Sequence, residues 1–283
     1  MPLDPNIVGK EFAPLRYSYN YRDVIIYALG IGAGVELEED LDFVYENQLK
    51  VLPTFGVLPP FQALLGFTEM EGVDINLAQL LHGEQYLEVC KHPLPVEGHL
   101  TSQPKVGSLY DKGKGALVEL DIDTVDQNGE SIFFNRFGIF LRGEGGFGGE
   151  KGPDPGYEPP ERKPDQVVEM KTLPQQAALY RLSGDYNPLH IDPNFAAMGG
   201  FNKPILHGLC SFGFAARAVL KQYGDNEPAN FKAVKTRFSR HVFPGETLVT
   251  EMWQESEEMI IFKCKVAERD EYCLTNSAVW LNK

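Results

Sequence analysis

The strongest constraint on the fold is an internal repeat, because the two halves of the 283-residue chain carry the same motifs in the same order. Residues 81–83 and residues 206–208 both read Leu-His-Gly, and each triplet is expected to open an apolar, helix-like stretch. A turn rich in Pro and Gly follows each stretch, at residues 92–98 and 241–245. A repeated plan of this kind indicates duplication of one structural unit.

Each half is also predicted to close with a pair of antiparallel strands. The first pair spans residues 116–125 and 131–141, and the second spans residues 259–266 and 272–281. Short polar turns separate the members of each pair, and residues 260–266 alternate apolar and polar as a half-buried strand does. Asn135 and Asn276 fall at matching places in the last strands. The sequence therefore predicts an α+β fold with two repeats, each an antiparallel sheet around a long central helix. Two unrelated α+β domains are the alternative.

A segment rich in Gly, Pro and charge separates the halves. We divide the chain into a first repeat (1–142), a linker (143–165) and a second repeat (166–283). Gly143, Gly145 and Gly148 fit the spacing G-x-G-x-x-G. That fingerprint binds a dinucleotide only where it opens a helix, and the prolines that follow exclude a helix here.

Composition and charge exclude several classes of function. The chain is 43% hydrophobic and 23% charged, and no apolar run is long enough to span a membrane. The net charge of −14 makes nucleic acid an unfavourable partner. The four cysteines form no C-x-x-C pair, and neither terminus carries a recognisable secretory or peroxisomal signal. Free thiols in a reducing compartment, such as the cytoplasm, are expected.

Candidate chemistry lies in the segment D-x-N-P-x-H, which contains Asp185, Asn187 and His190. Asn-Pro is a turn signal, so the carboxylate and the imidazole are expected on one short loop. A carboxylate beside an imidazole can hold a water molecule and share the roles of acid and base. The alternative is that Asp185 and Asn187 are turn residues and that His190 is a buried structural histidine.

A second candidate feature follows at His207 and Gly208, where an apolar helix is expected to begin. The first turn of a helix offers N–H groups without intrahelical partners. Such an N–H suits a thioester oxygen that gains negative charge during a reaction. The alternative role for Gly208 is close packing of the helix.

Residues 182–196 (LSGDYNPLHIDPNFA) and 203–215 (KPILHGLCSFGFA) resemble the signature of the MaoC-like, type 2 enoyl-CoA hydratases. This family includes the hydratase domain of peroxisomal multifunctional enzyme type 2. The resemblance extends over nearly the whole chain, including residues 52–57 (LPTFGV) and 80–88. It implies a double hot-dog fold. It also implies a catalytic pair in Asp185 and His190, a loop asparagine in Asn187 and a backbone oxyanion donor in Gly208.

The resemblance implies further site residues. Glu46 matches a glutamate of the first half that is important for activity. The residues that the resemblance places at the acyl-CoA substrate are His82, Gly83, Lys112, Tyr186, Pro188, Leu189 and Phe238. The first half lacks a D-x-N-P-x-H loop, so we expect one active site per chain.

The activity implied is reversible, (3R)-specific hydration of trans-2-enoyl-CoA in fatty acid β-oxidation, without a metal or another cofactor. The family implies a peroxisomal location and leaves a homodimer open. Three rival functions are an acyl-CoA thioesterase, a non-catalytic acyl-CoA-binding module, and a metal hydrolase that uses His190, Asp192 and His207. The metal hydrolase has no supporting ligand spacing.

Overall fold

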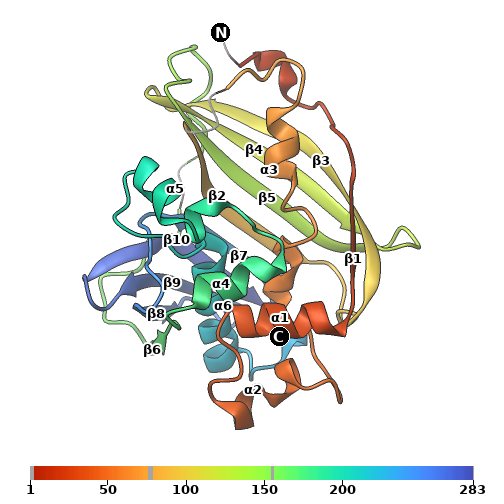
Figure 1. The fold of residues 1–283 in the computed structure, drawn as a ribbon, viewed down its shortest axis with the longest axis vertical. Coiled ribbons are helices and arrows are strands. Elements are labelled where there is room, and N and C mark those ends of the chain that lie inside the picture. The colour runs from red at the N-terminus through yellow and green to blue at the C-terminus, as the bar shows by residue number, and fades with distance from the viewer. Residues whose placement is uncertain (1–2, 76–78, 154–155, 283) are drawn as a thin grey trace.

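A single antiparallel sheet of ten strands forms the framework of the chain (Figure 1). The computed structural model describes residues 3–75, 79–153 and 156–282. The strand order is β1-β3-β4-β5-β2-β7-β10-β9-β8-β6. The strands are β1 (Leu15–Tyr19), β2 (Leu80–Val89), β3 (Gly98–Asp111), β4 (Gly115–Val125), β5 (Ser131–Arg142), β6 (Gln166–Lys171), β7 (Phe231–Phe238), β8 (Thr247–Gln254), β9 (Met259–Val266) and β10 (Glu271–Leu281).

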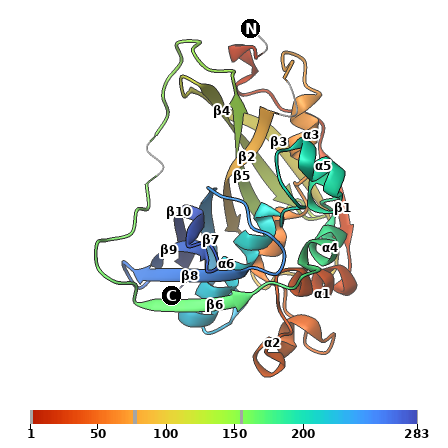
Figure 2. The same ribbon diagram turned by 60° about the vertical axis from the view of Figure 1, so that its left-hand side comes forward.

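The two halves of the sequence meet in the middle of this sheet. Strands β1 to β5 come from the first half, and β6 to β10 come from the second half. Strand β2 pairs with β7 from Glu84 opposite Arg237 to Glu88 opposite Ala233. The hydrogen-bonded sheet is therefore continuous across the junction, as Figures 1 and 2 show.

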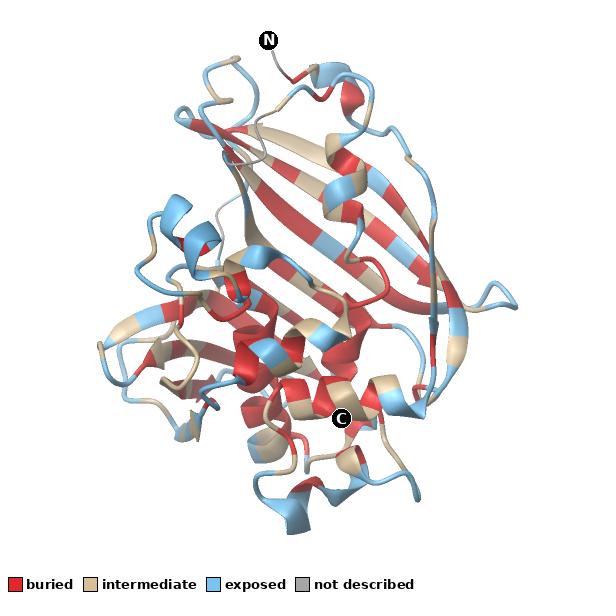
Figure 3. Cartoon of the chain, viewed as in Figure 1, coloured by how far each residue is buried: buried red, intermediate tan, exposed pale blue. Residues whose placement is uncertain are grey.

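One long helix, α6 (Gly208–Tyr223), packs against the sheet in the second half. All twelve residues from Leu209 to Leu220 are buried, because this helix is covered by strands on one side and by first-half segments on the other (Figure 3). The other helices are short: α1 (Tyr21–Gly30), α2 (Leu37–Val44), α3 (Ala63–Thr68), α4 (Gln176–Tyr180) and α5 (Pro193–Met198). Within the described ranges, none of these helices combines the length and the hydropathy needed to cross a bilayer.

The expectation of a helix that begins at His82-Gly83 is wrong, since residues 80–89 form strand β2. Gln85, Leu87 and Val89 are buried while the residues between them are partly exposed. That period of two is the period of a strand and differs from the 3.6-residue period of a helix. The described part of the first half therefore has no long central helix, although the α+β class itself is confirmed.

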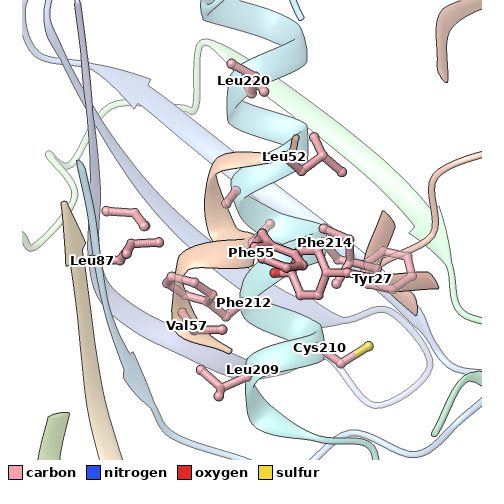
Figure 4. Close-up of a cluster of buried hydrophobic side chains, with 14 of the residues drawn as sticks. Tyr27, Leu52, Phe55, Val57, Leu87, Leu209, Cys210, Phe212, Phe214 and Leu220 are labelled. Carbon is pink, nitrogen blue, oxygen red and sulfur yellow. The ribbon is translucent and has the colours of Figure 1, made fainter. Parts of the chain in front are cut away.

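A buried 3-10 segment, η2 (Pro53–Val57), lies where the first half packs against α6. Phe55 and Val57 contact the same cluster of apolar side chains as Leu87 and Leu209 (Figure 4). A side chain at Gly56 would lie 2.5 Å from the ring of Phe133, so only glycine fits this position. The Gly56 carbonyl accepts a hydrogen bond from Asn135 Nδ2 at 3.0 Å.

Both predicted strand pairs are present within one residue of the expected ends. The turn between β4 and β5 is held by Asp126, whose carboxylate accepts hydrogen bonds from the amides of Asn128 and Glu130. Between the end of β5 at Arg142 and the start of β6 at Gln166, the described residues form no helix or strand.

Candidate active site

A cavity of about 830 Å³ lies where the two halves meet. Strands β2, β4 and β5 of the first half and β7 of the second contribute to its wall, together with the start of α6 and the loop before α5. The predicted site residues that line it are His82, Gly83, Lys112, Asp185, Asn187, Leu189, His190, Gly208 and Phe238. Residues more than a hundred positions apart in the sequence therefore share one cavity.

The D-x-N-P-x-H segment is a tight loop, as its turn residues predicted. Gly184 has φ +117°, which ends the helical turn before it and which other residues rarely adopt. The Asp185 carboxylate accepts a hydrogen bond from the Asn187 amide at 3.2 Å. Asn187 caps the 3-10 turn η5 (Pro188–His190) by accepting from the Leu189 amide at 3.0 Å. These local bonds fix the directions of Asp185 and His190.

His190 is held in one tautomer by the backbone. Its Nδ1 lies 2.9 Å from the carbonyl oxygen of Ile205, which can only accept, so Nδ1 carries the proton when the ring is neutral. The side chain is 8% exposed, and this burial lowers the pKa of His190 against the opposing effect of the Asp185 charge. The ring is therefore neutral near pH 7, and its Nε2 is free to accept a proton.

The pKa of Asp185 is shifted in the opposite direction to that of His190. Burial raises the pKa of its carboxyl, while the charge of His190 and the Asn187 amide lower it. Side-chain atoms of Asp185, His190 and His207 lie within 4.8 Å of one another. Burial therefore favours the uncharged form of each group relative to the free side chain, which suits a pair that exchanges protons with a substrate.

His207 completes this cluster from the position just before α6. Its ring stacks on that of His190 with a centroid separation of 3.8 Å and an interplanar angle of 29°. Its Nε2 donates to the backbone carbonyl of Asp185 at 3.2 Å. Burial and the neighbouring His190 lower the pKa of His207 to about 2, so this ring stays neutral. His207 thus joins the loop to the start of the helix.

Gly208 is the first residue of α6, and it borders the cavity. A side chain at this position would lie 3.1 Å from the ring of Phe238, so glycine keeps the helix start close to β7. Amides of the first turn have no intrahelical partner and carry the positive end of the helix dipole. The position can therefore stabilise negative charge within the cavity.

His82 contributes a third imidazole, and this one comes from the first half and lines the cavity. Its ring packs against Phe137 and Phe238 at centroid separations of 5.1 and 5.3 Å. Burial lowers the pKa of His82 to about 4, so this ring is also neutral near pH 7. Its Nε2 is buried without a hydrogen-bond partner among the described residues.

Three of the predicted site residues do not line the cavity. Glu46 lies beyond the end of α2 and is exposed. Tyr186 is 58% exposed and lies against the guanidinium of Arg181. Pro188 is exposed as the first residue of η5. Asp192, a member of the metal-hydrolase trio, caps α5 through the Asn194 amide at 2.8 Å.

The sequence interpretation did not include two features of the site. His207 was considered as the residue before the helix start and as a metal ligand. Its stacking on His190 was not predicted, although its place in P-I-x-H-G indicated a position next to the reacting groups. Lys235, Arg237 and Arg240 also line the cavity. The sequence feature that could have indicated these cations is their clustering at residues 235–240 of an otherwise acidic chain.

Two known sequence families match the two halves. The MFE-2 hydratase 2 N-terminal domain matches residues 17–143, and the MaoC like domain matches residues 157–275. Enoyl-CoA hydratase 2, peroxisomal, of Arabidopsis thaliana is 44% identical, over 95% of this chain and 92% of its own length. Peroxisomal hydratase-dehydrogenase-epimerase of Neurospora crassa is 47% identical over 96% of this chain. The chain spans only 31% of the length of that multifunctional relative.

Solved structures agree with these matches. The crystal structure of a MaoC-like dehydratase from Phytophthora capsici has 40% sequence identity and a TM-score of 0.89, with 99% of both chains covered. A Mycobacterium tuberculosis protein described as a double hotdog fold, at 13% identity and a TM-score of 0.56, shares the fold alone. The double hot-dog architecture is thereby confirmed. The chain belongs to the MaoC-like, type 2 enoyl-CoA hydratase family of hydro-lyases.

Proposed function

We propose that this chain hydrates trans-2-enoyl-CoA reversibly to (3R)-3-hydroxyacyl-CoA, with Asp185 and His190 as the acid–base pair. One observation carries the proposal. A carboxyl and an imidazole on one loop, with pKa values shifted in opposite directions by burial, border the same cavity as the first amide of α6. Addition of water to a double bond conjugated with a thioester carbonyl uses a base, an acid and a hydrogen-bond donor to the carbonyl oxygen in one site.

In the proposed reaction, His190 Nε2 takes a proton from water while the water oxygen bonds to Cβ of the enoyl group. The double-bond electrons move toward the thioester carbonyl, whose oxygen accepts a hydrogen bond from the Gly208 amide. The protonated carboxyl of Asp185 gives its proton to Cα. The proton on His190 then passes to the Asp185 carboxylate, which restores the pair. Asn187 holds the loop in position through its cap of η5.

The remainder of the cavity supports an acyl thioester as the substrate. Apolar residues of the first half line one part of it: Phe61, Leu64, Leu80, Leu81, Leu117 and Phe140. A hydrocarbon tail is stabilised by such a surface at roughly 0.8 kcal/mol for each buried CH₂. We propose one such site per chain, because the D-x-N-P-x-H loop occurs only in the second half.

The names of relatives suggest the biological setting. Both the Arabidopsis and the Neurospora relatives are named as peroxisomal. We propose that this chain serves fatty acid β-oxidation in the same compartment. We also propose that residues 1–142 and 166–283 are its two hot-dog repeats, joined by the linker 143–165.

The test follows the loss of absorbance of a conjugated enoyl thioester during hydration. Asp185→Asn and His190→Ala are each expected to lower kcat by ~10² or more, because each removes one acid–base group. Asp192→Asn is the matched control, since it changes a nearby carboxylate that only caps α5, and asparagine caps helices equally well. Near-normal turnover of folded Asp185→Asn and His190→Ala would contradict the proposal.

The same assay separates the rival functions. A thioesterase would release free CoA thiol, which a thiol reagent detects. A metal hydrolase would lose its activity with a chelator, whereas a binding module would bind the thioester without any loss of absorbance. Coupling the product to a dehydrogenase specific for (3R)- or for (3S)-3-hydroxyacyl-CoA tests the stereochemistry.

A further inference from the structure

The glycine-rich start of the linker is fixed to the end of the β3–β4 hairpin by one carboxylate. Asp111, the last residue of β3, accepts hydrogen bonds from the backbone amides of Gly113, Gly146 and Gly148, each at 2.8 Å. The amide of Asp111 in turn donates to the Glu150 carbonyl at 2.8 Å. These amides lower the pKa of Asp111, so the carboxylate is charged at neutral pH.

The spacing of the glycines is explained by this contact. Gly146 and Gly148 have φ values of +83° and +79°, which direct their amides to the carboxylate and which favour glycine. A side chain at Gly145 would lie 2.5 Å from the Gly113 carbonyl oxygen. Residues 143–148 thus bind the Asp111 carboxylate through backbone amides, in the way that other glycine-rich loops bind a phosphate.

The bound loop forms part of the cavity rim. Lys112 follows Asp111 directly, and its ammonium donates to the Lys151 carbonyl and lies 5.7 Å from the centre of the Tyr110 ring. Lys112, Arg142 and Pro153 all line the cavity. The loop therefore holds a lysine that lines the candidate active site.

The cavity is locally cationic although the chain is strongly acidic, with a net charge of −14. Its described lining includes the cations Lys112, Arg142, Lys235, Arg237 and Arg240 and the acids Glu84, Glu119 and Asp185. A cationic lining in an acidic protein suits the phosphates of a CoA thioester, for which Arg and Lys are the usual partners.

We propose that Asp111 is a positioning residue for substrate binding: through the glycine-rich loop it holds Lys112 where the ammonium contacts a phosphate of CoA. The inference rests on the proposed enoyl-CoA hydratase function. Asp111 itself does not touch the substrate. Its loss releases residues 143–153 and the lysine that they hold, and leaves the Asp185–His190 pair in place.

The experiment compares two substrates, an enoyl-CoA and the same enoyl thioester of pantetheine, which carries no phosphate. Asp111→Asn keeps the size of the side chain but removes the charge that binds three amides. We expect it to raise KM for enoyl-CoA by roughly tenfold, as for the loss of one charge-assisted hydrogen bond. The value of kcat for both substrates and the KM for enoyl-pantetheine should stay the same.

Three further measurements complete the design. Asp126→Asn is the matched control, because Asp126 holds the β4–β5 turn by similar amide bonds and does not line the cavity. Lys112→Ala should reproduce the KM change while leaving the three amide bonds of Asp111 intact, and Asp111→Asn should add little to it. Limited proteolysis without substrate should cut within residues 143–165 faster in Asp111→Asn than in the wild type.

An equal rise of KM for both substrates would overturn the inference, and so would additive effects of Asp111→Asn and Lys112→Ala. Unchanged proteolysis would also contradict it. If Asp111→Asn does not fold, Lys112→Ala with the two substrates still decides whether the rim contacts a phosphate. Failure of the wild type to hydrate either substrate would instead refute the proposed function.

Discussion

A buried ion pair joins α6 to the first half, and its removal should have a large cost. Arg217, at 8% exposure, donates to Asp40 at 2.8 Å and to the Ile31 carbonyl at 2.9 Å. The second oxygen of Asp40 accepts from the Gly34 amide at 2.8 Å. Asp40→Ala would leave the guanidinium buried with only one of these partners and the Gly34 amide without its acceptor. We expect a loss of ~3–5 kcal/mol in the free energy of unfolding, as for other broken buried pairs.

Urea unfolding at pH 7, followed by linear extrapolation, measures this loss. Asp42→Ala is the matched control, because Asp42 pairs with Lys50 at 3.0 Å while the two side chains are 51% and 38% exposed. It should cost at most about 1 kcal/mol. The double change Asp40→Leu with Arg217→Met removes both charges and should recover much of the loss. An effect of Asp40→Ala no larger than that of Asp42→Ala would refute the reasoning.

Two further predictions concern the chemistry. The pH profile of kcat/KM should be bell-shaped. Its acid limb should lie below the ordinary histidine pKa of about 6.5, because burial lowers the pKa of His190 and keeps the base neutral as the pH falls. The proposed acid role of Asp185 predicts an alkaline limb, which Asp185→Asn should remove; a rate that stays constant up to strongly alkaline pH would contradict that role. Gly208→Ala retains the amide but adds a methyl group 3.1 Å from the Phe238 ring, and should lower kcat/KM by up to about 10²-fold through misplacement. Adding Phe238→Leu should restore part of that loss, and no recovery would show that space at Phe238 is not the cause.

Features set by local sequence were predicted well. Asn-Pro after Gly184 defined a loop, and the structure bends there with Asn187 as the cap. The strand pairs in both halves were bounded by polar turns, and their ends agree within one residue. These elements are determined by residues close to one another in the sequence, so local patterns are sufficient to predict them.

Features set by long-range packing were not predicted. The triplet Leu-His-Gly opens a helix at Gly208 but lies in strand β2 at Gly83. Burial alternates along the residues after Gly83, whereas all residues from Leu209 to Leu220 are buried. The stacking of His207 on His190 depends on how the loop folds back over the helix start. The Asp111 contact with Gly146 and Gly148 likewise joins residues that local patterns do not relate.

The pairing of β2 with β7 also has a consequence for how the chain is made. Within the described residues, strand β2 pairs with β5 on one side and with β7 on the other. If the first half forms its strands during synthesis before the second half has emerged, the β7 edge of β2 stays unpaired, and unpaired edges promote aggregation. The polar residues on β2, Glu84, Gln85 and Glu88, then disfavour pairing with other nascent chains. The cavity is complete only after this central pair of strands has formed, because its lining comes from both halves of the sequence.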